Sequence, residues 1–358
     1  MWKGNSLRQY PLINMTNSSV KLTQFSPGAG CGCKISPADL RDILKQVPDK
    51  TCFDRLLVGC ESRDDAAVYD LGNGTALIST TDFFTPIVDD PYDFGRIAAA
   101  NAISDIYAMG GKPLLAVSIL GWPLSKLSAG MAGLVIEGAV EICRKAEIPL
   151  AGGHSIDISD PVFGLTVTGI AATDHIKQNS TAQAGCRLYL TKPLGLGILS
   201  TAGKKGLLQQ EDYLSAVRWM TKLNSVGIEL GKMACVSAMT DVTGFGLLGH
   251  LLELCEESGL AARISFNAIP QLDNLNHYIE KNCIPGGTFR NWLSYGEKIS
   301  ELTESQILVL ADPQTSGGLL IAVDQGASEF DDLVRENGFT EIGSLEEMSD
   351  RFFIKVND

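Results

Sequence analysis

Hydrophobic and polar positions alternate or recur along the chain in ways that predict short strands and helices. Residues 66–84 alternate apolar and polar positions on either side of Gly72, Asn73 and Gly74, which predicts two antiparallel strands joined by a tight turn. Residues 94–111 follow a helical apolar period and close on two glycines, so we expect a helix there. The predicted hairpin has acidic residues at both ends, which makes these ends candidates for chemistry.

Strands and helices continue to alternate over the rest of the chain. The same patterns predict strands over 116–121, 148–153, 163–172, 187–193, 262–270 and 319–323, and helices over 40–47, 127–146 and 212–233. Such alternation is typical of a mixed α/β fold. The polar, turn-rich segment 174–186 predicts a boundary between two α/β units.

Composition narrows the class of protein. The 358 residues are 45% hydrophobic, which is enough for two domains with buried cores. A net charge of -13 disfavours a surface for nucleic acid or anionic membrane, because a negative field repels phosphates. No apolar run in the sequence is long enough to span a bilayer. The nine cysteines are scattered and no secretory leader is recognisable, so we expect reduced thiols in the cytoplasm.

Residues 28–34 read GAGCGCK and place two cysteines in a glycine-rich stretch that ends in Lys34. Glycines allow such a stretch to fold over a site, and a lysine lowers the pKa of a nearby thiol and attracts phosphate. A catalytic lid is therefore one interpretation. Zinc binding together with Cys52 and Cys60 is a second, although the spacing is poor for zinc, and a flexible linker is a third.

Aspartates stand near the ends of the predicted strands. Asp64 and Asp65 precede the hairpin, Asp82 lies near its end, and Asp241 precedes a glycine-rich stretch. Each of these alone is also typical of a cap or a turn. Asp105 lies inside the apolar helix, where a cap does not explain it. Together the carboxylates favour a site for hard cations such as Mg²⁺, which bridge to phosphate oxygens.

Three glycine-rich motifs give weaker signals. Residues 152–155, GGHS, follow a predicted strand and suit either an anion-binding loop or a tight turn, and residues 311–318, ADPQTSGG, are predicted to be a structural loop. Residues 244–249 match G-x-G-x-x-G, but Asp241 would repel a pyrophosphate and the next strand lacks the acidic residue that binds a ribose. We therefore expect no dinucleotide site there, and the sequence has no Walker phosphate loop.

Six motifs together resemble those of one enzyme family. They are, in order, GAGCGCK, SRDDAAVY, TTDFFTPIVDDPYDFGRIAAANAISDIYAMGGKP, AGGHSI, AMTDVTGFGLLGH and ADPQTSGG. From about Leu22 to its end the chain is similar to the selenophosphate synthetases, also called selenide, water dikinases. The resemblance implies a two-domain α/β (α+β) fold of the aminoimidazole ribonucleotide synthetase type, in which N-terminal sheets pair into a barrel across a homodimer. It also implies that ATP binds in a metal-bridged cleft.

The resemblance implies an ATP-dependent phosphotransferase with two acceptors. The reaction is ATP + selenide + water → selenophosphate + AMP + phosphate, and it supplies the selenium donor for selenocysteine and selenated tRNA. Cys31 and Lys34 match the family's catalytic positions. The family's ligands for two or more Mg²⁺ ions are matched by Asp65, Asp105 and Asp241.

Nucleotide-binding positions of the family are matched by Lys34, Ser62, Arg63, Asp64, Asp82, Asp105, Gly153, His154 and Ser155. Asp82 and residues 153–155 match positions that reach ATP across the dimer interface. The family pattern has threonine where this chain has Ser62. The implied partners are a second copy of the chain and small-molecule selenide, with no nucleic acid and no membrane.

On this basis we expect four segments and weigh two alternative functions. The segments are a disordered arm over 1–21, a glycine-rich catalytic lid with the first helix over 22–50, an ATP- and metal-binding dimerisation domain over 51–180, and a C-terminal α/β domain over 181–358. The alternatives are another ATP-dependent enzyme of the same superfamily and a non-catalytic ATP-binding paralogue. Neither has a use for the Cys-Gly-Cys-Lys lid, and a paralogue is expected to have replaced Cys31, which is present here.

Overall fold

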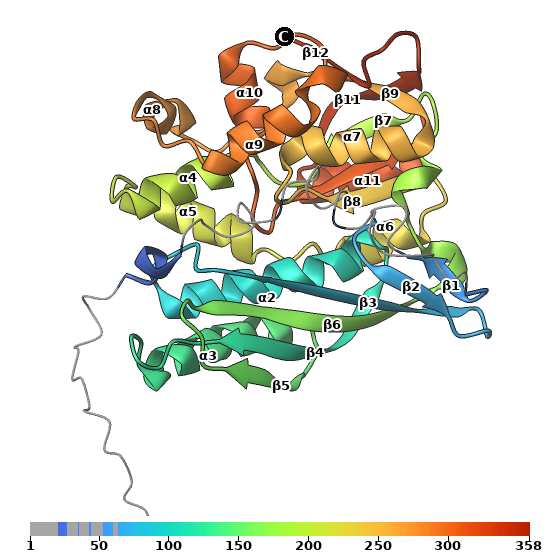
Figure 1. Cartoon of the computed structure of the whole chain (residues 1–358). Helices are drawn as coiled ribbons and strands as arrows, with labels where there is room; N and C mark the ends of the chain where they lie inside the picture. The colour runs from blue at the N-terminus through green and yellow to red at the C-terminus, as the bar shows by residue number, and fades with distance from the viewer. Residues whose placement is uncertain (1–20, 27–34, 36–42, 44–52, 60–63) are drawn as a thin grey trace, which may run out of the picture.

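The computed structural model describes residues 21–26, 35, 43, 53–59 and 64–358 (Figure 1). Two six-stranded sheets lie in it, one in each half of the chain. Residues 1–20 of the predicted arm, and the predicted helix over 40–47 apart from residue 43, lie outside the described residues. Within the described ranges, no helix combines the length and the apolar character needed to cross a membrane.

The first sheet has the strand order β1-β2-β3-β6-β4-β5, in which β4 and β5 pair in parallel and the other neighbours pair antiparallel. Its strands are β1 (Leu56–Val58), β2 (Ala67–Asp70), β3 (Thr75–Phe84), β4 (Lys112–Gly121), β5 (Leu150–Ile156) and β6 (Val162–Ala172). The predicted hairpin is confirmed, because β2 and β3 pair across Gly72 and Gly74, whose φ angles of 81° and 79° suit glycine. The predicted strands over 116–121, 148–153 and 163–172 are confirmed too.

Two long helices cover one face of the first sheet. α2 (Pro91–Ala108) begins at the N-cap Asp90, whose side chain accepts a hydrogen bond from the Asp93 amide. α3 (Ala129–Lys145) begins at Ser128 in the same way. α2 packs on β3, β6 and α3, and its opposite side faces the second half of the chain (Figure 1). This place between the two halves explains why most of α2 is buried.

The strands of the first sheet have a second face, directed away from α2. On β3 the exposed positions are Ser79, Thr81 and Phe83, which alternate with positions that are buried or, at Asp82, half-buried. Residues directly opposite each other in a sheet share a side. By this register Tyr69, opposite Leu77, and Leu115, opposite Thr168 and then Ser79, lie on the same side as Phe83. We call this side, with Tyr69, Ser79, Thr81, Phe83 and Leu115, the outer face.

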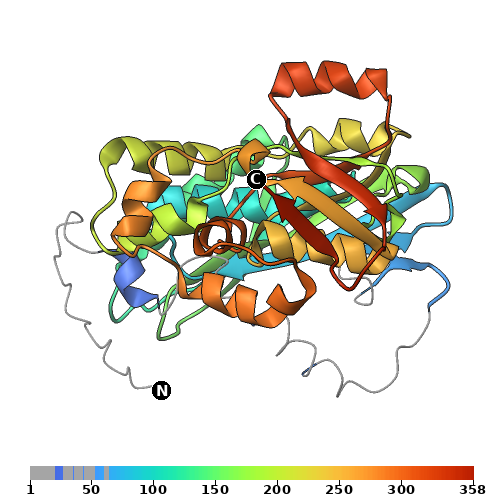
Figure 2. The same cartoon turned by 90° about the horizontal axis from the view of Figure 1, so that it is seen from above.

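The second sheet has the strand order β12-β9-β11-β7-β10-β8. Its strands are β7 (Arg187–Leu190), β8 (Val236–Asp241), β9 (Leu260–Ser265), β10 (Leu319–Val323), β11 (Thr340–Glu347) and β12 (Ile354–Asn357). The helices of this half are α4 (Leu196–Lys204), α5 (Gln210–Thr221), α6 (Gly227–Lys232), α7 (Gly246–Ser258), α8 (Leu275–Glu280), α9 (Gly286–Tyr295), α10 (Glu304–Leu310) and α11 (Ser328–Asn337). All five residues of β10 are buried, because α7 covers one face of the sheet and α11 the other (Figure 2).

Some helices and strands of the second half differ from those that the sequence patterns predict, because tertiary contacts determine where they begin and end. The predicted helix over 212–233 is two helices, α5 and α6, and the chain turns between them to pack on α2. A Cβ at Gly227 would lie only 2.2 Å from the Tyr107 carbonyl oxygen, so this approach requires glycine. The predicted strand over 262–270 ends at Ser265. The sequence patterns do not predict strands β8, β11 and β12.

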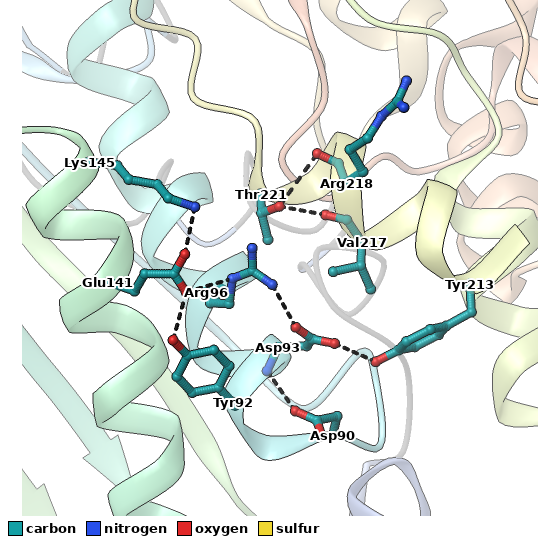
Figure 3. Close-up of polar contacts among 10 residues, drawn as sticks. All are labelled: Asp90, Tyr92, Asp93, Arg96, Glu141, Lys145, Tyr213, Val217, Arg218 and Thr221. Atoms are coloured by element: carbon teal, nitrogen blue, oxygen red, sulfur yellow. Dashed lines mark hydrogen bonds and ion pairs between the residues drawn. The ribbon is translucent and has the colours of Figure 1, made fainter. Parts of the chain in front are cut away.

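A polar network joins α2 and α3 to α5 of the second half (Figure 3). The Tyr213 hydroxyl donates to Asp93 Oδ2 at 2.7 Å, and Arg96 binds the other Asp93 oxygen at 2.9 Å. Arg96 Nε also lies 3.1 Å from Glu141 Oε2, which accepts a hydrogen bond from the Tyr92 hydroxyl at 2.7 Å. The N-terminal part of α2 is thereby tied to both of its helical neighbours.

Candidate active site

Three aspartates from distant parts of the chain meet between the two halves. Asp65 precedes β2, Asp105 lies in α2, and Asp241 ends β8. One carboxylate oxygen from each residue lies within 4.8 Å of those of the other two. The fold thus gathers the three residues that we predict to bind magnesium. Carboxylates at this separation suit a hard cation that takes oxygen ligands.

The acid cluster, Asp65, Asp105 and Asp241, is unfavourable in the absence of a cation. Burial raises the pKa of the Asp65 carboxyl well above its ordinary value, and the charges of Asp241, Asp105 and Asp64 raise it further. A hydrogen bond of 3.1 Å from Thr240 Oγ1 to Asp65 Oδ1 acts in the opposite direction. A divalent cation would offset the repulsion between the carboxylates, so this set of donors fits Mg²⁺.

Two hydrogen bonds between β3 and α2 orient carboxylates next to each other. Thr80 Oγ1 donates to Asp105 Oδ2 at 2.5 Å, and Asn101 Nδ2 donates to Asp82 Oδ2 at 2.5 Å. Thr80 and Asp82 are two residues apart on a strand, and Asn101 and Asp105 are four apart on a helix, so each pair shares a face. Asp82 therefore lies about one helical turn from Asp105 of the same chain.

Of the other residues predicted to bind the nucleotide, Asp64 lies next to Asp65 of the acid cluster. Asp64 Oδ1 accepts a hydrogen bond of 2.7 Å from the backbone amide of Asn179, in the segment that links the two sheets. This contact ties the start of the first sheet to that segment. The predicted site residues Cys31, Lys34, Ser62 and Arg63 lie outside the described residues.

Residues 153–155 lie in β5 at the edge of the first sheet, where the strand continues instead of forming the turn or loop that the glycines suggest. By register His154 is opposite Ile119, which is opposite Gly164 and then Phe83, so its side chain is on the outer face. Three strand spacings separate β5 from β3, about 14 Å. The structure does not bring residues 153–155 to the acid cluster of their own chain.

Sequence reasoning missed the neutral groups that hold the carboxylates. Thr80, Asn101 and Thr240 each donate to an aspartate of the site. The helical spacing of Asn101 and Asp105 is a signal that the sequence contains. The hydroxyl groups could not be assigned from the sequence, because only the folded chain shows which carboxylate each one faces.

The fold and this site place the chain in a known class. Residues 63–171 match the family model "AIR synthase related protein, N-terminal domain", and residues 183–355 match "AIR synthase related protein, C-terminal domain". The chain is similar to thiamine-monophosphate kinase from Stenotrophomonas maltophilia K279a, with 19% identity, a TM-score of 0.62, and coverage of 89% of this chain and 94% of that one. A structure titled "AaThiL complexed with AMPPCP and TMP" matches with 18% identity, a TM-score of 0.67, and coverage of 90% and 93%. These structures confirm the predicted two-domain α/β fold, whereas the barrel across a dimer stays a prediction.

Curated relatives define the family more narrowly. The selenide, water dikinase of Photorhabdus laumondii subsp. laumondii is 57% identical over 346 residues, which are 96% of this chain and 100% of the relative. The selenide, water dikinase of Pasteurella multocida is 58% identical over 312 residues, 87% of this chain and 89% of the relative. The chain belongs to the selenide, water dikinase family, which confirms the resemblance carried by the six motifs.

Proposed function

We propose that this chain catalyses ATP + selenide + water → selenophosphate + AMP + phosphate. The observation that carries the proposal is the acid cluster, found in a chain whose relatives at 57% and 58% identity are selenide, water dikinases. ATP carries about four negative charges near neutral pH, so carboxylates can face its phosphates only through cations. The product, selenophosphate, would be the selenium donor for selenocysteine and selenated tRNA.

In this proposal the described residues of the site bind the cations and orient the carboxylates that hold them. Asp65, Asp105 and Asp241 would hold two or more Mg²⁺ ions, which when bound neutralise the phosphate oxygens. Thr80 and Thr240 keep the carboxylates of Asp105 and Asp65 in fixed orientations. Preorganised groups of this kind lower the barrier to phosphoryl transfer, because little reorganisation is needed when charge develops.

The glycine-rich segment with Cys31 and Lys34 completes the site in this proposal. Its role rests on the motif GAGCGCK. Lys34 would stabilise charge on the transferred phosphoryl group, Cys31 would handle selenide, and closure of the segment would exclude water until selenide is in place. Ser62, Arg63 and Asp64 are assigned to the nucleotide. The five cysteines in the described ranges are free thiols, which suits the reducing cytoplasm.

The same proposal includes a homodimer that pairs through the outer face of the first sheet. Phe83 is 52% exposed on this face and Leu115 is 38% exposed, although both are large and apolar. His154 lies on the same face, so pairing of two such faces would bring residues 153–155 to a neighbouring chain. In this arrangement residues 51–180 form the dimerisation domain and residues 181–358 the second domain.

Phosphorus NMR of an anaerobic reaction with ATP, Mg²⁺ and selenide tests the proposed function. We expect signals of selenophosphate, AMP and phosphate, all of which depend on selenide. Release of ADP and phosphate at a rate that selenide does not change would instead indicate another ATP-dependent enzyme of this fold. ATP binding without turnover under these conditions would indicate a non-catalytic paralogue.

A further inference from the structure

The loop between α10 and β10 is a polar segment in a buried place. We call residues 312–318 the strap. Its polar side chains are at most 2% exposed and belong to Asp312, Gln314, Thr315 and Ser316. The sequence suggests only a structural loop here, yet burial of polar groups is unfavourable unless they find partners. The partners of the strap therefore show what it holds in place.

One end of the strap is fixed to the start of α4. The Gln314 Oε1 atom accepts hydrogen bonds from the backbone amides of Gly195 and Leu196, at 3.2 and 3.1 Å. Asp312 Oδ2 accepts from the amides of Gly197 and Ile198, at 3.0 and 3.4 Å. The first amides of a helix have no partner within the helix, so these four bonds satisfy them and anchor the strap.

The other end of the strap reaches α2, beside the acid cluster. The Ser316 amide donates to Asn101 Oδ1 at 2.8 Å, and the Nδ2 atom of the same Asn101 donates to Asp82. The Gly317 carbonyl accepts from Asn224 Nδ2 at 2.9 Å, and that nitrogen also donates to Ser104 Oγ at 2.8 Å. The strap thus contacts the turn of α2 that leads to Asp105.

Lys192 fixes the same end of the strap from the side of the second sheet. Its ammonium group is buried and donates to the carbonyl oxygens of Ser316 and Lys222, at 2.9 and 2.7 Å. Desolvation lowers the pKa of Lys192 to about 7. The Gly318 carbonyl accepts from the amide of Val242, the residue that follows β8, at 2.8 Å. A Cβ at Gly318 would lie 2.4 Å from the Lys192 backbone nitrogen, so the close packing requires glycine.

We propose that the strap is a positioning element of the Mg-ATP site, which holds Asn101 so that its amide fixes the Asp82 carboxylate beside the acid cluster. The inference rests on the proposed function and adds Asn101 to it as a positioning residue. An asparagine amide has one oxygen and one NH₂ group. Because the Ser316 amide engages the oxygen, the NH₂ group is directed to Asp82. The second half of the chain thereby sets the orientation of a carboxylate in the first.

The variant Asn101→Asp tests this inference with the shape of the side chain preserved. Aspartate at this position can still accept from the Ser316 amide, but it cannot donate to Asp82 as an ionised group, and it adds a negative charge. The matched control is Asn291→Asp, because Asn291 is also a buried amide and donates to two backbone carbonyls, those of Gly244 and Ala311. Calorimetric titration with Mg-ATP and the melting temperature are measured for both variants and for the unsubstituted chain.

We expect Asn101→Asp to bind Mg-ATP about 10- to 100-fold more weakly, since a hydrogen bond to a charged group is lost. Asn291→Asp should bind within about 3-fold of the unsubstituted chain, although its melting temperature falls by a comparable amount. If both variants bind equally well or equally weakly, the strap is only structural and the inference is wrong. If Asn101→Asp fails to fold, the variant Lys192→Met is used to test the inference instead. Weaker Mg-ATP binding by Lys192→Met at an unchanged melting temperature supports the inference, and unchanged binding overturns it.

The unsubstituted chain separates failure of this inference from failure of the proposed function. If it binds no Mg-ATP, the proposed function is wrong and the inference falls with it. If it binds Mg-ATP and forms selenophosphate while Asn101→Asp binds Mg-ATP equally well, the function stands and only the strap's positioning role is refuted.

Discussion

The two sheets of this protein differ in how their faces are covered. In the second sheet every residue of β10 is buried, with α7 on one face and α11 on the other. In the first sheet α2 and α3 lie on one face, whereas the outer face exposes large apolar side chains such as Phe83 and Leu115. Exposed apolar groups gathered on one surface are typical of a site of protein association. The second sheet is covered by its own helices, while the first has a face suited to pairing.

The predicted site residues also lie on two different sides of the first sheet. The acid cluster lies where α2 meets the second half, and Asp82 is hydrogen-bonded to α2 on that side. His154 instead lies on the outer face of the first sheet. We infer that both halves of one chain supply the carboxylates, and that a second copy would add groups only from its outer face.

The largest effect is expected when either half of the chain loses a carboxylate of the acid cluster. Asp105→Asn in the first half and Asp241→Asn in the second should each lower turnover by at least about 1000-fold, because a lost carboxylate weakens cation and phosphate binding. The rate of AMP formation measures this, with circular dichroism to verify folding. Asp174→Asn, at an exposed aspartate, is the matched control and should remain active. Normal rates in both variants of the cluster would refute the metal assignment.

Loss of the thiol that we propose to be reactive, that of Cys31, should abolish selenophosphate formation but not nucleotide binding. Cys31→Ser is expected to lose selenide-dependent turnover and to keep Mg-ATP binding, because the acid cluster is unchanged. Cys33→Ser should stay active and serves as the control. Selenophosphate formation followed by phosphorus NMR, together with calorimetry, distinguishes the two variants. A normal rate for Cys31→Ser would leave the linker interpretation of this segment in place.

Local patterns in the sequence predict the hairpin of β2 and β3, which Asp65 precedes, and the helix α2, which carries Asp105, but not β8, which carries Asp241. Gly72 and Gly74 identify the hairpin, an apolar period identifies α2, and the position of Asp105 inside that helix marks it as unusual. These features depend on neighbouring residues, so a single sequence displays them. The family motifs then indicate which aspartates belong to one site.

The supporting contacts could not be predicted, because they join residues far apart in the chain. Ser316 and Asn101 are separated by 215 positions, and the strap is predicted only as a structural loop. β8 is buried along most of its length, so it has no alternation that marks it as a strand. These contacts form only when the two halves of the chain pack against each other.

A charge on the outer face should dissociate the proposed dimer. Phe83→Lys is expected to raise the dissociation constant by at least about 100-fold, since a lysine would be desolvated between two apolar surfaces. Analytical ultracentrifugation over a concentration series measures the change. Leu293→Lys is the control, because Leu293 is 84% exposed on α9 of the second half. A Phe83→Lys protein that stays dimeric would show that pairing uses another surface.

Mixing of inactive variants should show which residues share a chain. When Asp65→Asn is mixed with His154→Ala, about a quarter of the sites should recover, because half of the dimers are mixed and one site in each has all its groups. Asp65→Asn mixed with Asp82→Asn should recover only if Asp82 serves the neighbouring chain. The position of Asp82 next to Asn101 predicts no recovery. AMP formation after subunit exchange measures both mixtures, and recovery in the second mixture alone would reverse the assignment.

The smallest effect concerns the pH dependence of stability at the strap. Asp312 is fully buried, and burial raises the pKa of its carboxyl to about 8. The folded chain then retains a proton that the unfolded chain loses above the ordinary value of 3.8. The stability from this proton is fully present below that value and is lost as the pH rises through about 8.

Asp312→Asn stays neutral, so its free energy of unfolding should gain about 2 kcal/mol relative to the unsubstituted chain between pH 6 and 8. Urea denaturation at both pH values measures this difference, and Asp174→Asn, which changes an exposed carboxyl, should show none. A constant difference across this range would mean that the Asp312 carboxyl is ionised in the folded chain and held by the amides at the start of α4.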